Sequence, residues 1–360
     1  MKIIKRDGTR AVFEKEKIEV AIAKSFASVD SVVTDEKLGE MSDKIVATIK
    51  EKYPKDHVVS VEEVQDLVEL TLIDENYYRE VKSFILYRAK HNMDRKVMND
   101  FENYINDKEI LAIVENIQEE FDNQRYPIES LYLKFESFTK VNMTDDDLLK
   151  ALTRAASELT SKETPDWEII AARFLMHEID LGIKRNEERF DIVDFKSKID
   201  YLTSNGLYGE YIKENYSSED FDELESYIQK QRDKLFTYSG LDLVKKRYLI
   251  RTFTGDIIES VQEMFMGIAM HLAIPEKDRV GFAKRLYDIL SSLKATMATP
   301  TMTNARKPFN QLSSCFIDTV PDTLKGIYRS ITNFAEVSKH GGGMGLSLIH
   351  ILTLPTILLV

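Results

Sequence analysis

The sequence predicts an α+β fold that is mostly helical, with β-structure near its two ends. Residues 1–181 contain only two glycines, and residues 167–274 contain no proline. Long stretches without these two residue types are typical of helices. At the start, β-rich segments flank Asp7-Gly8, and after Thr299 short strand and helix patterns alternate. This alternation predicts that an α/β domain begins there.

The first predicted element is a β-hairpin formed by residues 3–6 and 9–13. An Asp-Gly pair between β-rich runs is a strong hairpin signal, because glycine readily takes the positive φ of a tight turn. Four helices should follow, since apolar residues recur every three or four positions. Their markers are Ile18, Ile22 and Phe26; Leu38, Met41, Ile45 and Ile49; the capping-box pair Ser60 and Glu63; and the run from Tyr77 to His91. We therefore predict one small module over residues 1–95.

Three further parts are predicted after this module. They are residues 96–235, which are helical and acidic; residues 236–345, a helical lead-in followed by the first part of an α/β domain; and residues 346–360, an uncharged tail. The acidic groups at 145–147 and 219–220 suit helix starts, where the helix dipole favours negative charge. Within the α/β part we predict a strand over 311–319 and a helix over 324–337.

Composition excludes several classes of protein. One cysteine, Cys315, cannot form an intrachain disulfide or a four-cysteine zinc site, which indicates a reducing compartment. The net charge of -12 argues against broad binding to nucleic acid or to a membrane surface. The longest apolar run, residues 346–360, is too short to span a bilayer and contains Pro355. The six histidines show no metal-ligand spacing. We expect a soluble cytoplasmic protein without a metal site.

Three local features could carry chemistry, and each also has a structural explanation. The first 25 residues hold seven basic and four acidic side chains, which could grip phosphates or form a solvated hairpin face. The glycines at 341–343 could let the backbone approach a ligand or form a flexible turn, and they match neither standard phosphate loop. Cys315 could be a small buried hydrophobe or a reactive thiolate favoured by the nearby Arg306 and Lys307.

Two motifs in the N-terminal module carry a family resemblance. They are residues 5–8, Lys-Arg-Asp-Gly, with the helix that follows, and residues 87–90, Tyr-Arg-Ala-Lys. Together they resemble the ATP-cone, the nucleotide-sensing module of ribonucleotide reductases. The resemblance implies that ATP activates and dATP inhibits through this module.

Three later motifs extend the resemblance. They are residues 298–302 (Ala-Thr-Pro-Thr-Met), 311–315 (Gln-Leu-Ser-Ser-Cys) and 339–345 (Lys-His-Gly-Gly-Gly-Met-Gly), in that order. They resemble the start of the catalytic α/β barrel in the large subunit of class I ribonucleotide reductase. The resemblance covers roughly residues 1–345. It implies reduction of ribonucleoside diphosphates to deoxyribonucleotides by thiyl-radical and dithiol chemistry.

Site residues follow from position matching within this resemblance. The substrate-binding positions are Thr299, Ser314, Cys315 and Gly343, with Cys315 as the redox-active half of a cysteine pair. The effector positions that select the base are Asp322, Thr323 and Leu324. The ATP-cone positions are Lys5, Arg6, Ala11, Val12, Phe13, Glu14, Lys15, Glu16 and Lys17, with Arg88 or Lys90 completing the site. These residue types suit nucleotides, because cations, hydroxyls and backbone N–H groups bind phosphate and ribose oxygens.

The resemblance also implies partners. They are a small subunit that carries a dimetal radical cofactor, a second large subunit, thioredoxin or glutaredoxin, and ribonucleoside diphosphates; no metal in this chain, no nucleic acid and no membrane are implied. The family's radical-carrying cysteine and second redox cysteine have no counterpart in this chain. We therefore expect a truncated gene product that is inactive alone, with residues 346–360 non-native. The alternative is a nucleotide-sensing binding module without catalysis.

Overall fold

The computed structural model describes residues 2–5, 8–54, 57–122, 124–140 and 142–347. The chain divides into two compact units, Met1–Tyr104 and Ile105–Val360. Each unit combines a large helical part with a few short strands, so the predicted α+β class is confirmed. The predicted module end at residue 95 lies inside a helix that reaches Glu102.

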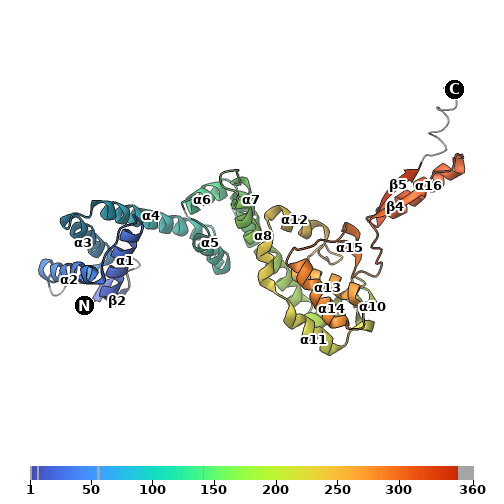
Figure 1. Ribbon diagram of the computed structural model, residues 1–360, viewed down its shortest axis with the longest axis horizontal. Coiled ribbons are helices and arrows are strands. Elements are labelled where there is room, and N and C mark those ends of the chain that lie inside the picture. Colours follow the sequence, from blue (N-terminus) through green and yellow to red (C-terminus); the bar gives the residue numbers. More distant parts are fainter. Residues whose placement is uncertain (1, 6–7, 55–56, 123, 141, 348–360) are drawn as a thin grey trace, which may run out of the picture. The chain divides into compact units, whose positions relative to one another are not determined.

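The first unit contains a small three-stranded sheet and four helices (Figure 1). Strand β1 (Lys2–Ile4) pairs antiparallel with β2 (Arg10–Val12) and parallel with β3 (Val59–Ser60). The helices are α1 (Lys15–Ala27), α2 (Asp35–Lys52), α3 (Val61–Asp74) and α4 (Tyr78–Glu102). The hairpin and the four helices were predicted, whereas β3 was not. Apolar side chains of all four helices, including Ile22, Ile45 and Leu72, form one buried core.

Helix α3 begins where the sequence indicated. Ser60 accepts from the amide of Glu63, and the Glu63 carboxylate accepts from the amide of Ser60 at 2.8 Å. This reciprocal capping satisfies two backbone donors that a helix start leaves free. Since Ser60 is also the last residue of β3, the cap fixes the point at which the chain leaves the sheet.

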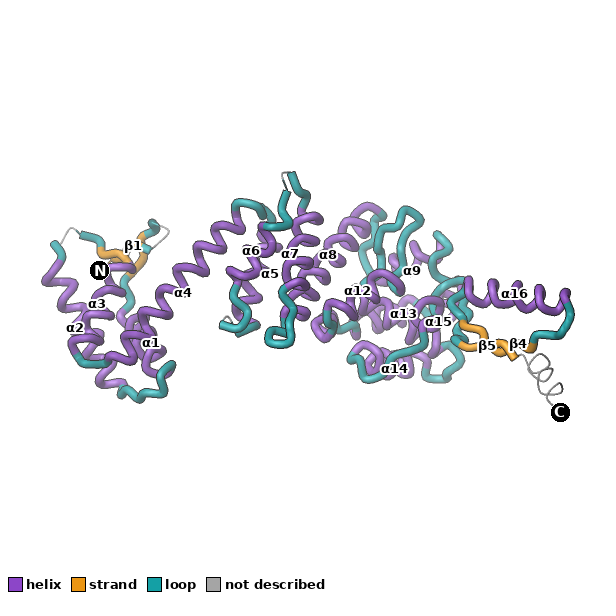
Figure 2. Tube along the Cα trace, turned by 90° about the horizontal axis from the view of Figure 1, so that it is seen from above, coloured by secondary structure: helices purple, strands orange, loops and turns teal. Residues whose placement is uncertain are grey.

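Most of the second unit is a body of packed helices (Figure 2). Its elements are α5 (Lys108–Glu120), α6 (Ile128–Glu136), α7 (Asp145–Glu158), α8 (Trp167–Arg189), α9 (Phe195–Ser204), α10 (Glu210–Asn215), α11 (Ser218–Tyr227), the 3-10 helix η1 (Lys230–Leu235), α12 (Tyr238–Arg247), α13 (Val261–Ala273) and α14 (Arg279–Ser291). Nearly every side chain of α13 is buried, so this helix lies at the centre of the body. The acidic groups predicted to start helices do begin α7 and α11.

The last described elements form a strand–helix–strand unit. Strand β4 (Cys315–Thr319) pairs in parallel with β5 (Gly343–Ser347), and α16 (Leu324–Lys339) connects them (Figure 1). A short helix, α15 (Thr299–Asn304), precedes them. The predicted α/β start is confirmed, although β4 is shorter than the predicted strand because residues 311–314 do not take part in the ladder.

The C-terminal tail is only partly described. Leu346 and Ser347 belong to β5, where they pair with Asp318 and Thr319. Residues 348–360, the greater part of the predicted non-native tail, lie outside the described residues. Among the helices of the described part, we find none whose length and apolar character would let it cross a membrane.

Candidate functional site

The hairpin loop of the first unit presents a lysine to solvent. The amide of Lys5 donates to the carbonyl of Thr9 at 2.8 Å, and the amide of Gly8 donates to the carbonyl of Lys5 at 3.0 Å. Gly8 has φ +81°, a conformation that favours glycine, so its place in the loop is explained by the turn. The side chain of Lys5 is exposed. Arg6, which was predicted beside it, lies outside the described residues.

The start of α3 lies at the same sheet edge as this loop, because Ile4 pairs with Ser60 in the parallel ladder. His57 contacts the carboxylate of Glu63 at 3.1 Å and stacks on Tyr53 with ring centroids 4.8 Å apart. The amide of Ser60 and, to a smaller extent, His57 hold the pKa of Glu63 below its ordinary value. His57 and Tyr53 were not predicted, because the pairing of β3 with β1, which no local pattern indicates, places their segment beside the hairpin.

The other predicted ATP-cone positions extend along β2 and into α1. Ala11 and Val12 lie in β2, and Phe13 packs on the core of the unit. The carboxylate of Glu14 contacts the ammonium of Lys17 at 3.0 Å. Val12 pairs with Lys2, so the start of α1 lies at the opposite end of the hairpin from Lys5. A three-residue strand is about 10 Å long, so the two ends are close enough for one nucleotide to contact both.

Lys15 and Glu16 occupy the first turn of α1. The ammonium of Lys15 lies 2.5 Å from the carboxylate of Asp43 on α2, and it also contacts Glu19 at 3.6 Å. The hydrogen bond to Asp43 raises the pKa of Lys15, so this lysine stays charged. The ion pair of Lys15 with Asp43 therefore joins α1 to α2. Glu16 is exposed.

Arg88 is bound to three carboxylates of α3. Its guanidinium reaches Glu62, Asp66 and Glu69 at 2.5, 2.6 and 2.8 Å. Burial alone would lower the pKa of Arg88, but the hydrogen bonds to these carboxylates raise it. A guanidinium that already binds three carboxylates has little capacity left for phosphate. Lys90 lies in α4, and its side chain is outside the described residues.

In the second unit, strand pairing joins three predicted substrate residues. The amide of Gly343 donates to the carbonyl of Ser314 at 2.7 Å, and Cys315 pairs with Gly343 across the parallel ladder. The hydroxyl of Ser314 lies 3.5 Å from the sulfur of Cys315. Cys315 is a free, exposed thiol. The buried-hydrophobe interpretation of this residue is therefore wrong.

Asn304, at the end of α15, ties this helix to both strands. Its side-chain amide donates to the carbonyl of Gln311 at 3.0 Å and to the carbonyl of His340 at 3.2 Å. These carbonyls belong to the segments that lead into β4 and β5. Thr299, the predicted substrate residue at the start of α15, is exposed, and its hydroxyl lies 3.5 Å from that of Tyr248. Asn304 and Tyr248 were not predicted, because no local pattern marks a contact across such sequence distances.

A buried ion pair anchors the segment after α15. Arg306 and Glu259 are both 0% exposed, with N–O distances of 2.5 and 2.6 Å. Arg306 also donates to the carbonyls of Met302 and Tyr248. The suggestion that Arg306 activates the thiol of Cys315 is therefore wrong, since its guanidinium is directed into the helical body. Burial lowers the pKa of its neighbour Lys307, and the charge of Arg306 adds to this effect.

The three predicted specificity residues lie at the start of α16. Thr323 caps the helix, since its hydroxyl accepts from the amide of Gly326 at 3.1 Å. Asp322 and Leu324 are exposed. A carboxylate beside a helix N-terminus combines an acceptor with free backbone donors, which suits the hydroxyls and base edges of a nucleoside.

The glycine run after α16 is explained in part by packing. Gly341 has φ +81° at the end of the helix, and the amide of Gly342 donates to the carbonyl of Val337 at 3.0 Å. A Cβ at Gly342 would lie 2.8 Å from both Phe316 and Val337. At Gly343 the nearest atom is 3.6 Å away, so the fold itself tolerates a side chain there. In the part of the chain with described coordinates, no three His, Cys, Asp or Glu side chains are grouped to bind a metal ion.

Comparison with protein families gives three matches along the chain. Residues 1–93 match the ATP cone domain, residues 234–310 match the all-alpha domain of ribonucleotide reductase, and residues 313–352 match its barrel domain. The first match lies in the first unit, and the other two lie in the second unit. The barrel match extends past Gly345, into the segment predicted as a non-native tail.

Similar proteins are named as reductase subunits. The chain is 45% identical over 350 residues to the ribonucleoside-diphosphate reductase subunit alpha of Treponema pallidum, covering 96% of this chain and 41% of that protein. It is 30% identical to the subunit of the same name from Chlamydia pneumoniae, covering 95% and 35%. It is 27% identical to the ribonucleoside-diphosphate reductase 1 subunit alpha of Escherichia coli, in an alignment that covers 56% of this chain and 26% of that protein. The chain thus spans less than half the length of each relative.

Proposed function

This chain belongs to the ribonucleotide reductase large-subunit family through its ATP-cone, all-alpha and early barrel domains, and we propose that it is the N-terminal part of an enzyme that reduces ribonucleoside diphosphates to deoxyribonucleotides. The observation that carries the proposal is the pairing of Cys315 with Gly343, which puts an exposed thiol beside the glycine segment 28 positions later in the chain. Asn304, in the short helix that begins at Thr299, contacts the segments that lead into both strands.

Cys315 supplies one of two thiols in the proposed reaction. A thiyl radical on a further cysteine starts the reaction on the ribose. Two thiols then become a disulfide and release two electrons and two protons, which convert the 2′ C–OH bond to C–H while the hydroxyl leaves as water. The hydroxyls of Thr299 and Ser314 and the amides near Gly343 would hold the ribose and the diphosphate by hydrogen bonds. The second redox thiol has to come from outside these 360 residues, which hold one cysteine.

The first unit is proposed to bind the effectors ATP and dATP. Lys5 in the hairpin loop would contact phosphate, with Arg6 beside it. The first turn of α1, where Glu14, Glu16 and Lys17 are exposed, would contact the nucleoside. The exposure of Lys5 supports this assignment, and the commitment of Arg88 to α3 favours Lys90 as the residue from α4.

A second effector site is proposed at the start of α16. Asp322 would accept from an effector hydroxyl or base, while Thr323 and Leu324 supply backbone positions beside the helix start. The partners proposed for the whole protein are a small subunit that carries a dimetal radical cofactor, a second large subunit, and thioredoxin or glutaredoxin. A nucleotide sensor without catalysis is less well supported, because it leaves the grouping of Ser314, Cys315 and Gly343 without a role.

The test is to express the reading frame that contains this chain together with the coding sequence that follows it. With a small subunit and thioredoxin, the product should form deoxynucleotides from ribonucleoside diphosphates. Cys315→Ser should abolish this turnover while dATP binding persists. A native frame that stops at codon 360, or full turnover by Cys315→Ser, contradicts the proposal.

A further inference from the structure

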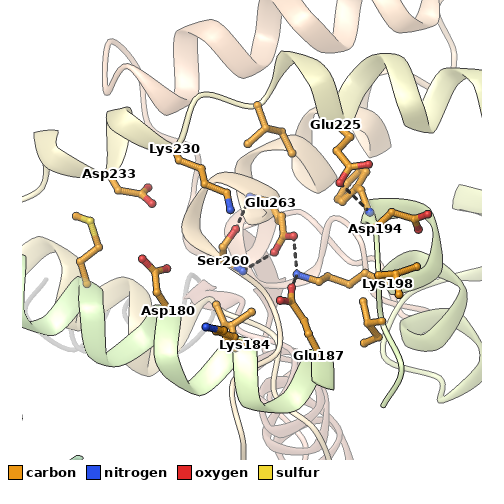
Figure 3. Close-up of a pocket in the computed structure, with 16 residues that line it drawn as sticks. Asp180, Lys184, Glu187, Asp194, Lys198, Glu225, Lys230, Asp233, Ser260 and Glu263 are labelled. Atoms are coloured by element: carbon orange, nitrogen blue, oxygen red, sulfur yellow. Dashed lines mark hydrogen bonds and ion pairs between the residues drawn. The ribbon is translucent and has the colours of Figure 1, made fainter. Parts of the chain in front are cut away.

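The helical body of the second unit contains a cavity of about 490 Å³ that the proposed reductase sites do not use. Residues of α8, α9, α11, η1 and the start of α13 line it (Figure 3). Its charged side chains are those of Asp180, Glu187, Asp194, Glu225, Asp233 and Glu263, and of Lys184, Lys198 and Lys230. Six carboxylates therefore face three ammonium groups, so the lining carries excess negative charge.

Four of the six carboxylates have structural partners. Lys198, which is almost fully buried, contacts Glu187 and Glu263 at 2.6 Å each. Asp194 accepts from the amide of Ser197 and caps α9. Glu225 accepts from the amide of Phe195 at 3.1 Å. These groups shape the cavity and are not free for a ligand.

Asp180 and Asp233 have fewer partners: Asp233 is buried, whereas Asp180 lines the cavity but is exposed to solvent. Asp233 is 6% exposed, and its Oδ1 accepts from the side-chain amide of Gln262 at 2.6 Å. Its Oδ2 accepts no hydrogen bond from any residue with described coordinates, and in that same part of the chain Asp180 has neither a hydrogen bond nor an ion pair. Burial raises the pKa of Asp233 to about 7, and the charge of Asp180 adds to this effect. Desolvation by the cavity wall raises the pKa of Asp180 to about 6, although this residue remains exposed to solvent on its other side.

Lys230 also reaches the cavity (Figure 3). Its charge lowers the pKa of both carboxylates, so it supplies part of the missing compensation. Its side chain is exposed at the mouth. A cation that enters from solvent would therefore compete with Lys230 for the two carboxylates.

The remaining wall of the cavity is apolar. It is formed by Met176, Ile183, Ile192, Val193, Phe195 and Ile228. We propose that the cavity binds a small aliphatic amine, whose ammonium group lies between Asp180 and Asp233 and whose hydrocarbon chain lies on this wall. An ammonium can donate to both carboxylates at once, and the wall removes methylene groups from water. A bare metal ion fits less well, because the described residues offer no group of three ligands and the wall offers it nothing.

Calorimetric titration of the full chain with cadaverine tests the proposal. The titration is made at about pH 8, above the pKa of both carboxylates. The diol of the same chain length is the matched neutral ligand, and it should bind at least about tenfold more weakly. Asp233→Asn and Asp180→Asn should each weaken cadaverine binding about tenfold. Lys230→Gln should tighten binding, which a merely structural lysine would not do.

Asp222→Asn is the matched control, because Asp222 is an exposed carboxylate of α11 that does not line the cavity. It should bind cadaverine like the parent chain. An asparagine at 233 can still accept from Gln262, and Trp167 fluorescence verifies that each variant is folded. If Asp233→Asn does not fold, Asp180→Asn and the diol decide the question. The proposal is overturned if the chain does not bind cadaverine or if the diol binds as tightly as cadaverine. It is also overturned if Asp222→Asn loses as much affinity for cadaverine as the cavity variants do.

Discussion

Arg306 and Glu259 form a fully buried ion pair that fixes the end of α15 against the start of α13. The pair joins residues 47 positions apart in the sequence. Tyr208 donates to the same carboxylate from a third segment, and the amide of Ile250 donates to its other oxygen at 2.9 Å. The position of α15, and with it of Thr299, thus depends on a network whose members all lie in the helical body.

Replacing one member of this pair should destabilise the second unit strongly. Arg306→Gln leaves the Glu259 carboxylate buried without its cation, which should lower the free energy of unfolding by about 3–5 kcal/mol. Urea unfolding followed by the fluorescence of Trp167, the one tryptophan, measures the change. The double variant Arg306→Gln/Glu259→Gln should lose less than the sum of the single variants. Arg285→Gln, which removes an exposed pair with Asp278, is the control and should cost under about 1 kcal/mol. A loss that small for Arg306→Gln would contradict the assigned role.

The stability of the second unit should fall as pH rises, because of Asp233. The pKa of this group is about 7 in the folded chain, against about 3.9 when unfolded. The folded state therefore binds the extra proton between these values, so the contribution is complete below about pH 4 and is lost as pH rises through about 7. Relative to the parent, Asp233→Asn should gain about 1–3 kcal/mol of unfolding free energy between pH 5 and pH 8. Urea unfolding at pH 5 and at pH 8 measures the free energy of unfolding of parent and variant. If the difference between Asp233→Asn and the parent is the same at both pH values, as is expected for Asp222→Asn, Asp233 does not cause the pH dependence.

Lys5→Ala should weaken dATP binding to this chain. Loss of a charge-assisted contact costs about 1.5–3 kcal/mol, which is about 10- to 150-fold in affinity. Isothermal titration calorimetry measures the change. Lys24→Ala is the control, since Lys24 is exposed in the last turn of α1 and is not one of the predicted nucleotide-contacting positions. Unchanged affinity of Lys5→Ala would remove Lys5 from the site.

Gly342→Ala should loosen the β4–α16–β5 unit. The added methyl would lie 2.8 Å from both Phe316 and Val337, so β4 or α16 has to shift. Overpacking of this kind costs about 1–3 kcal/mol. Hydrogen exchange at the amides of β4 and β5 reports the loss. Gly345→Ala is the matched control, because the nearest atom there is 3.8 Å away. Equal exchange in the two variants would show that the packing at Gly342 is not tight.

Purified chain 1–360 should form no deoxynucleotide, even with a small subunit and thioredoxin present. The reaction consumes two thiols per turnover, and this chain has Cys315 alone. A radiolabelled diphosphate assay measures product. Titration with a thiol reagent is the control, and it should find one reactive thiol per native chain because Cys315 is exposed. Product above the protein-free baseline would refute the assignment.

Local patterns predicted much of the fold. The Asp-Gly turn, the helical periodicity and the capping pair at Ser60 and Glu63 depend on neighbours within four residues, and each is found as expected. Strand β3 escaped prediction because two residues, Val59 and Ser60, carry no period of their own. Their strand geometry comes from pairing with β1, more than 50 positions earlier in the chain.

The site was predictable by residue type but not by contact. The sequence placed Ser314, Cys315 and Gly343 in one site, and the parallel ladder joins them. The ion-pair partners of the arginines could not be predicted, because they depend on which carboxylates from distant parts of the chain pack beside each guanidinium. Arg88 and Arg306 were both considered for chemistry, and each is occupied by glutamates from another part of its unit.

The β4–α16–β5 unit has a consequence for how the nascent chain is handled. Each strand pairs with the other, and no third strand joins either outer edge in the part of the chain that the structure describes. Ile317 on β4 is 87% exposed, and Leu324, Tyr328, Ile331 and Phe334 form an exposed apolar face on α16. Unpaired backbone beside exposed apolar side chains is the surface that binds other unfinished chains. Residues 315–347 should therefore be prone to associate with other chains for as long as this surface stays uncovered during synthesis.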